Sequence, residues 1–311
     1  MRVAAAFKSS IEECFSRFDY DFSKVNILYT PLADCKISYN YRLVLCDNDS
    51  YTLHNSGVDI TPYQILKKHI ALKADYYVSF DYFIKPEHSM EEKVRIYNKN
   101  KSYMEDWIKY IGADRVIVPI HCYDKRSFVN LCEYVYSKDI NYIAFAYSIK
   151  RINILTAKPY NNTTEYFNII RYLTKYIKDK YKFKIHFFAP NIPIPLLIST
   201  GIDTFDSRYE TLRANNRRYI GYTDGKVYDI CLGKRYDKLE SSDKELVKQF
   251  IQYCDCIICQ KYINVILNND RFTVAALFLH NHYVLNKYIE DLKKKNNIIN
   301  NNQTLLEDYI D

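Results

Sequence analysis

The chain has 311 residues, of which 48% are hydrophobic, so it holds enough apolar material for a large core. Its 44 basic and 37 acidic residues leave a net charge of +7, which permits a polyanionic partner without requiring one. The first twenty residues lack the apolar run of a signal peptide, and no stretch reaches the roughly 18 apolar residues of a membrane span. We therefore expect a soluble, cytoplasmic protein with no membrane partner.

Short apolar runs predict buried parallel strands, because their hydrophobicity is flat rather than alternating. The clear runs are 42–47, 75–81, 115–121, 141–146, 184–189 and 202–206, and the weaker ones are 3–6 and 26–29. Amphipathic stretches between them predict helices over 62–72, 90–111, 125–137 and 164–181. This alternation indicates an α/β fold with a parallel sheet. Eight strands fit a (β/α)8 TIM-type barrel, and an open doubly wound sheet is the alternative.

Polar residues stand at the carboxyl ends of four predicted strands, namely Asp47, Asp81, His121 and Asp206. In a barrel these ends converge on one face, where active sites lie. Any one of these residues could be a helix cap. Four of them together favour a shared site and therefore favour the barrel.

The pattern changes after Asp206. Residues 218–230 predict two strands around a Thr-Asp-Gly turn, 241–253 a capped helix, and 271–295 a long helix. We therefore divide the chain into a barrel catalytic region over 1–217, a small C-terminal subdomain with a closing helix over 218–295, whose cysteines are considered next, and an Asn-rich flexible tail over 296–311.

Three cysteines, Cys254, Cys256 and Cys259, lie within six positions. In a reducing compartment such crowding indicates metal binding rather than disulfides. The fourth ligand is expected from His280 or His282 on the following helix. Three cysteines and one histidine form a closed tetrahedral zinc site, which is structural rather than catalytic. Three buried free cysteines are the alternative.

These cysteines and the segment Leu279-His280-Asn281 resemble the zinc signature of the guanine transglycosylase family, C-x-C-x-x-C followed by a helix with a His-Asn pair. The resemblance selects His280 as the ligand. It extends over about residues 42–288 and implies a pentosyltransferase that exchanges one base for another.

The segment that ends in Phe205-Asp206 resembles the nucleophile segment of that family. The resemblance implies that Asp206 attacks the sugar C1′ as guanine leaves, giving a covalent glycosyl-enzyme. A second base then attacks, and two inversions give net retention. Residues 45–51 resemble the "T-D-S-G-G-Y-Q" segment, which implies that Asp47 is the general acid/base. Asp49 takes that role if the register differs by two.

Three further segments correspond to base-recognition segments of the family. Val78-Ser79-Phe80-Asp81 resembles "A-F-D", which implies that Asp81 accepts hydrogen bonds from guanine N1–H and N2–H and so rejects adenine. His121 stands where the family has the Gln of "Q-G-G", and Ala146 and Tyr147 stand in the region of an "A-I-G-G" loop. The glycines of these loops are replaced, which leaves the identity of the incoming base open.

Several residues after Asp206 resemble the archaeal branch of the family: Tyr209, Leu212, Ala214, Arg218 and Tyr219. With the lost glycines and no RNA-binding module after the zinc subdomain, the pattern is similar to the phage and bacterial branch that acts on DNA. That branch exchanges guanine in DNA for a 7-deazaguanine base such as preQ0 and protects DNA from restriction. It implies flipping of the target nucleotide and, for a phage protein, a location in the host cytoplasm.

Arg213, Arg217 and Arg218 follow Asp206 in the chain and are our candidates for contacts to phosphates. A solvated basic face is the alternative for them. Two other functions stay open, a tRNA-guanine transglycosylase and a catalytically silent subunit that pairs with an active paralogue. The sequence does not decide the oligomeric state, and a homodimer is among the options.

Overall fold

The computed structural model describes residues 2–6, 14–33, 37, 39–50, 53, 60–146, 163–188, 194–207, 209–233, 241–269 and 271–302. These residues form two compact units. The first consists of Met1–Ala6, Phe22–Ile192 and Thr200–Ser207, and the second of Phe7–Asp21, Pro193–Ser199 and Arg208–Asp311. The division therefore falls ten residues before the expected one after Arg217, and two upstream segments join the second unit.

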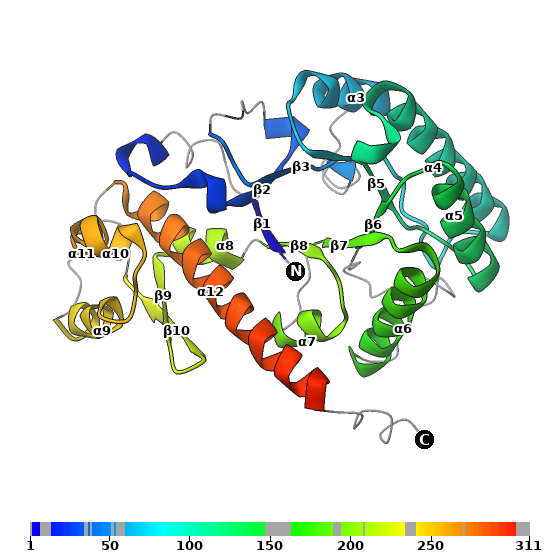
Figure 1. Ribbon diagram of the computed structural model, residues 1–311. Helices are drawn as coiled ribbons and strands as arrows, with labels where there is room; N and C mark the ends of the chain where they lie inside the picture. Colours follow the sequence, from blue (N-terminus) through cyan, green and yellow to red (C-terminus); the bar gives the residue numbers. More distant parts are fainter. Residues whose placement is uncertain are drawn as a thin grey trace. The chain divides into compact units, whose positions relative to one another are not determined.

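Eight parallel strands of the first unit form a closed barrel in sequence order (Figure 1). The strands are β1 (Arg2–Ala6), β2 (Asn26–Tyr29), β3 (Leu43–Cys46), β4 (Tyr76–Val78), β5 (Val116–Pro119), β6 (Tyr142–Ala146), β7 (Lys184–Phe188) and β8 (Thr204–Ser207). Strand β1 closes the ring because it pairs with both β2 and β8. The barrel prediction is confirmed, including the two strands with the weakest signal, and the open sheet is excluded.

Apolar residues fill the barrel strands as the flat hydrophobic runs predict. All four residues of β2, β3 and β5 are buried. Leu45, Val78 and Ile117 come from three neighbouring strands and pack in one cluster. Side chains inside a small barrel form a packed core rather than a pore. The reactive groups are therefore confined to the ends of the strands.

Four helices of the first unit lie outside the strands: α3 (Pro62–Ala71), α4 (Met90–Ile111), α5 (Lys125–Ser137) and α6 (Thr163–Tyr181) (Figure 1). Their starts follow from local side chains. Thr61 caps α3 through Gln64, Ser89 accepts from Glu92 N at the start of α4, and Asp124 caps α5 through Ser127. Such caps satisfy backbone N–H groups that the helix leaves unpaired. The predicted helix ranges are confirmed to within one residue.

The second unit holds the elements that follow the barrel in sequence, together with the earlier helix α7 (Ile194–Ser199) and the short 3-10 helix Phe15–Arg17. The later elements are α8 (Tyr209–Asn215), β9 (Arg218–Thr223), β10 (Lys226–Cys231), α9 (Ser241–Ile251), α10 (Ile257–Lys261), α11 (Ile263–Leu267) and α12 (Thr273–Asn302). Strands β9 and β10 form the expected antiparallel hairpin. Helix α9 lies close to it, since a Cβ added to Gly221 would come within 2.6 Å of the Phe250 ring. Helix α12 continues to residue 302, into the segment expected to be a flexible tail, and residues 303–311 lie outside the described part.

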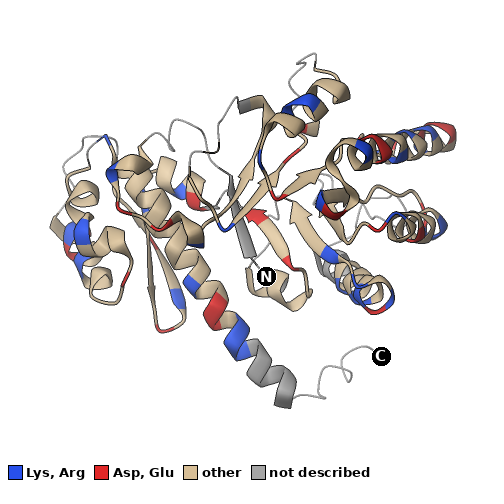
Figure 2. Ribbon diagram, turned by 45° about the horizontal axis from the view of Figure 1, so that its top comes forward, with Lys and Arg blue, Asp and Glu red and all other residues tan. Residues whose placement is uncertain are grey.

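Charge is mixed over the first unit. Basic and acidic residues are interspersed along the helices around the barrel (Figure 2). Among the described residues, no helix combines the length and hydropathy needed to cross a bilayer.

Candidate active site and metal centre

Four ionisable side chains lie at the carboxyl ends of the barrel strands. Asp47 directly follows β3, Asp206 is the third residue of β8, Asp81 follows β4 and His121 follows β5. The charges of Asp206 and Asp81 both act on Asp47, and His121 contacts Asp81 directly. The structure therefore brings these residues together, as expected for the catalytic face of a barrel.

Asp47 is held mainly in its protonated form. Burial and the neighbouring charges of Asp49 and Asp206 raise its pKa to about 8, although the Asn48 amide donates to its Oδ1 at 2.8 Å. A buried carboxyl beside other carboxylates favours its neutral form because ionisation would add a second negative charge in a region of low polarity. An acid with a pKa near the working pH is suited to general acid/base catalysis.

Asp81 has the opposite environment. Burial alone would raise its pKa, but the facing His121 and hydrogen bonds from Ser50 and Asn48 outweigh burial and lower it. Asn48 Nδ2 donates to Oδ1 at 2.6 Å and Ser50 Oγ donates to the same oxygen at 2.7 Å, while His121 Nε2 contacts Oδ2. A carboxylate has about four acceptor positions. Three are used here, so guanine would find one free position rather than the expected two unless His121 moves.

The loop after β3 has a backbone that its residue types explain. Asp49 has φ of 55°, in the left-handed region that Asp and Asn adopt more readily than most residues. Its Oδ2 accepts from Leu32 N at 2.8 Å, which ties this loop to the one after β2. Asp49 is the position where the resembling family has its first glycine, and a glycine would adopt this conformation without strain. Asp49 is therefore engaged in holding two loops together, whereas Asp47 has the raised pKa.

His69, a buried histidine that the sequence analysis did not single out, fixes the backbone of Asp47 by a hydrogen bond. Trp107 Nε1 donates to His69 Nδ1 at 2.9 Å, and His69 Nε2 lies 2.8 Å from the Asp47 carbonyl oxygen. Because Nδ1 accepts a proton donor, Nε2 carries the hydrogen and donates it to Asp47. Burial lowers the pKa of His69 to about 4, so it stays neutral. The pair α3–α4 thus fixes the backbone of Asp47 without adding a positive charge beside it.

The remaining expected site residues have different positions. Ala146 is the last residue of β6, and Tyr147 lies outside the described residues. Arg217 is buried and donates to Asn269 at 2.7 Å within the second unit. Arg213 and Arg218 are partly exposed, and both pair with Asp229, at 2.7 and 2.6 Å. Packing and ion pairing within the second unit therefore account for much of the basic cluster.

Cys254, Cys256, Cys259 and His280 form a metal-binding site in the second unit. Their ligand atoms all lie within 4.8 Å of one another. His280 Nδ1 is 3.8, 3.3 and 3.3 Å from the three sulfur atoms, in sequence order. Ligands around a tetrahedral ion with M–S of about 2.3 Å and M–N of about 2.0 Å are about 3.5 Å apart. The donor set and its spacing therefore fit one four-coordinate ion.

Neighbouring side chains orient the metal ligands. His280 Nε2 lies 2.9 Å from the Ile220 carbonyl oxygen, so it carries the hydrogen and leaves Nδ1 to face the ion. Asn281 bonds both Ile220 N and Arg218 O at 3.0 Å and fixes β9 beside the site. His282 instead faces Glu210 at 3.2 Å and Asn286 at 2.9 Å. The structure therefore selects His280 over His282.

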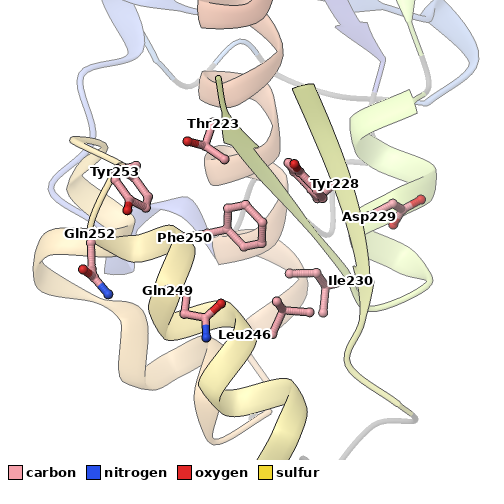
Figure 3. Close-up of a pocket in the computed structure, with 9 residues that line it drawn as sticks. All are labelled: Thr223, Tyr228, Asp229, Ile230, Leu246, Gln249, Phe250, Gln252 and Tyr253. Atoms are coloured by element: carbon pink, nitrogen blue, oxygen red, sulfur yellow. The ribbon is translucent and has the colours of Figure 1, made fainter. Parts of the chain in front are cut away.

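A cleft of about 490 Å³ lies in the second unit, between the β9–β10 hairpin and α9 (Figure 3). Tyr228, Phe250 and Tyr253 line it, with Gln249 and Gln252. Its single carboxylate, Asp229, points away from the cleft in Figure 3 and is paired with arginines. Apart from Asp229, its lining has no carboxyl group, histidine or lysine, so the strand-end cluster is the better candidate for the active site.

Comparison with known proteins fits this geometry. The model of the queuine tRNA-ribosyltransferase family matches residues 41–304, which is most of the chain. The chain belongs to this transglycosylase family. The match includes the four barrel-end residues and all four metal ligands. No curated protein is significantly similar to the chain.

The high pKa of Asp47 predicts how stability depends on pH. The folded-state pKa of about 8 exceeds the unfolded value, so the folded state loses stability relative to the unfolded state as pH rises from about 4 to 8. Asp47→Asn removes this penalty. We expect its free energy of unfolding relative to wild type to increase by about 4 kcal/mol between pH 5 and pH 9, since the two pKa values leave about three pH units of this range at 1.36 kcal/mol each. Urea unfolding at both pH values measures it, and Asp203→Asn is the control. A difference that does not change with pH would contradict the burial of Asp47.

The metal site predicts one bound ion per chain. Cys259→Ser should lose the ion and lower the melting temperature, because metal binding contributes to folding of the surrounding segment. Cys231→Ser is a matched control, since Cys231 is an exposed cysteine of the same unit. Elemental analysis and thermal unfolding provide the readouts. Equal metal content in the two variants, or a folded wild-type protein with no metal, would refute the assignment.

Proposed function

We propose that this protein exchanges guanine in DNA for a 7-deazaguanine base such as preQ0, through a covalent intermediate on Asp206. The observation that carries the proposal is the position of Asp206 at the same barrel end as Asp47, a carboxyl with a pKa of about 8. One carboxylate can attack while the other carboxyl moves a proton. Membership of the queuine tRNA-ribosyltransferase family supports base exchange as the reaction type.

The first half of the reaction forms a glycosyl-enzyme. A carboxylate oxygen of Asp206 attacks C1′ of the target nucleotide, the C1′–N9 bond breaks, and guanine leaves with the bonding electrons. Asp47 donates its proton to the departing base. Protonation lowers the barrier because the base no longer leaves as an anion.

The second half reverses these roles. The Asp47 carboxylate takes a proton from the incoming base, whose nitrogen attacks C1′ and releases Asp206 as a carboxylate. Two inversions retain the configuration at C1′. The balance requires no redox step, and bound base must exclude water to prevent hydrolysis of the intermediate.

Base recognition falls to Asp81 and His121. Asp81 is ionised and has one acceptor position left beside its bonds to Asn48, Ser50 and His121. We infer that His121 turns towards the base when it enters and releases a second acceptor position for guanine N1–H and N2–H. Ala146 and Tyr147 complete the proposed base pocket.

Zinc is the ion we propose for the Cys3His site. Three thiolates and one imidazole are typical of structural zinc, and four protein ligands leave no open position for substrate. The ion would thus join α10 to α12, and β9 is fixed beside it by its hydrogen bonds to His280 and Asn281. The ion takes no part in the proton transfers.

DNA as the substrate is supported by the departures from the family pattern. Asp49 replaces a glycine after β3, and the buried Cys122 follows His121 where the family has a glycine. The target nucleotide of a duplex must be flipped out to reach Asp206. Arg213 and Arg218 are the proposed phosphate contacts, with Asp229 as the group that phosphate would displace.

Transfer RNA is the second candidate substrate, and the printed description of the matching family favours it. A catalytically silent subunit is less consistent with three carboxyl groups at one barrel end, of which Asp81 and Asp206 are buried and Asp47 is half-buried. Such a set costs stability and has no evident structural use.

The substrate prediction is tested by nucleoside analysis. Cells that make 7-deazaguanine bases and express the protein should contain the modified deoxynucleoside in DNA, with tRNA unchanged. Mass spectrometry of hydrolysed DNA and tRNA measures both. A strain expressing Asp206→Asn is the control. Modified tRNA with unmodified DNA would replace the DNA proposal with the tRNA function.

The nucleophile prediction uses two aspartates of the same segment. Asp206→Asn should lower guanine exchange by several orders of magnitude and abolish a trapped protein–nucleic acid adduct, because the amide is a poor nucleophile. Asp203→Asn is the matched control, since Asp203 bonds Lys178 and Ile185 N instead of the carboxylate cluster. Incorporation of radiolabelled guanine and denaturing gels provide the readouts. The assignment fails if Asp206→Asn is active and Asp203→Asn is not.

A further inference from the structure

A buried histidine lies beside the proposed nucleophile. His186 is on β7 with no exposed surface, and its Nε2 is 3.5 Å from Asp206 Oδ1. Within the described part of the chain, Nε2 has no hydrogen-bond partner at normal length. A buried N–H or ring nitrogen without a partner costs free energy, so its position needs an explanation. Asp206 is the group that it faces.

The hydrogen bonds on the other side of the ring indicate where its proton lies. His186 Nδ1 is 2.8 Å from Thr204 Oγ1, and the Tyr142 hydroxyl contacts the same oxygen. Thr204 has one hydrogen. If Tyr142 donates to Thr204 and Thr204 donates to Nδ1, then Nε2 carries the hydrogen and points it at Asp206. The opposite order would set the lone pair of Nε2 against a carboxylate oxygen, which is repulsive.

We propose that His186 is a positioning residue for the nucleophile: the chain Tyr142–Thr204–His186 presents an N–H to Asp206 Oδ1. The proposal rests on the proposed function of Asp206. The bond to Oδ1 restrains the carboxylate while its other oxygen, Oδ2, attacks C1′. In the first half, C1′–N9 breaks as C1′–Oδ2 forms. In the second, C1′–Oδ2 breaks and negative charge returns to the carboxylate.

The same N–H has opposite effects in the two halves. A hydrogen bond to a carboxylate makes it a weaker base, and therefore a better leaving group. The observed 3.5 Å is long, and catalytic hydrogen bonds often shorten only when substrate is bound. Removal of the N–H should slow breakdown of the glycosyl-enzyme more than its formation. Adduct should then accumulate relative to turnover, which a general packing defect would not produce.

The test compares three substitutions in the hydrogen-bond chain Tyr142–Thr204–His186. His186→Phe keeps the ring but removes the donor, and it should lower exchange 10- to 100-fold while the fraction of protein trapped as adduct rises. His186→Gln can place an amide N–H near the position of Nε2 and should recover most of the exchange. Thr204→Val removes the group that fixes the ring and should show a smaller loss. Thr174→Val is the matched control for Thr204→Val, because Thr174 is a buried threonine of the first unit that does not belong to the Tyr142–Thr204–His186 hydrogen-bond chain.

Three results decide the outcome. Exchange and adduct that both stay at wild-type levels in His186→Phe would overturn the proposal, as would a parallel fall in both without recovery in His186→Gln. A wild-type protein with neither exchange nor adduct, on DNA or tRNA, contradicts the function of Asp206 itself. A measurement without substrate separates the two cases: ¹⁵N NMR of histidine-labelled protein, assigned with His186→Phe, should show hydrogen on Nε2. Hydrogen on Nδ1 alone would refute the positioning role.

Discussion

Carboxylates buried at one end of a barrel constrain the rest of this structure. Several negative charges in a region of low polarity repel one another, and each also loses its hydration. The chain meets this cost in two ways. Asp47 keeps its proton, whereas Asp81 stays ionised because Asn48, Ser50 and His121 face it. Two like groups thus have opposite protonation states, so near neutral pH one can donate a proton while the other accepts hydrogen bonds.

Neutral hydrogen-bond donors serve this arrangement better than cations would. A protonated histidine beside Asp47 would lower its pKa and remove the acid. Burial keeps His69 neutral, and the bond from Trp107 to Nδ1 leaves Nε2–H to donate to the Asp47 carbonyl. The fixed backbone matters because a proton carrier displaced by about 1 Å can lose much of its effect. Rigid helices and a tryptophan thus contribute to a site whose reactive groups lie on strand ends.

Much of the fold follows from local sequence, and part of the site does not. Flat apolar runs predicted all eight barrel strands, amphipathic stretches predicted α3 to α6, and close cysteine spacing predicted three of the metal ligands. His186 and His69 were missed because their partners are remote: Thr204 is 18 residues from His186, and Trp107 is 38 from His69. His186 also lies in an apolar run whose pattern predicts only a buried strand. The sequence did not predict that Phe7–Asp21 and Pro193–Ser199 belong to the second unit, because only tertiary contacts join these segments to the later part of the chain.

The metal site has no open coordination position, so its ion would not assist the carboxyl groups of the barrel. Cys254, Cys256, Cys259 and His280 supply four ligands, and a tetrahedral ion with four protein ligands has no position for water or substrate. The residues around the site also have a structural role. Asn281 bonds Ile220 N and His280 bonds the Ile220 carbonyl, and both bonds fix β9 in place. In the proposed reaction, proton transfer and nucleophilic attack would therefore depend on side chains alone. Small differences in hydrogen bonding would then decide which carboxyl group carries the proton and which one attacks.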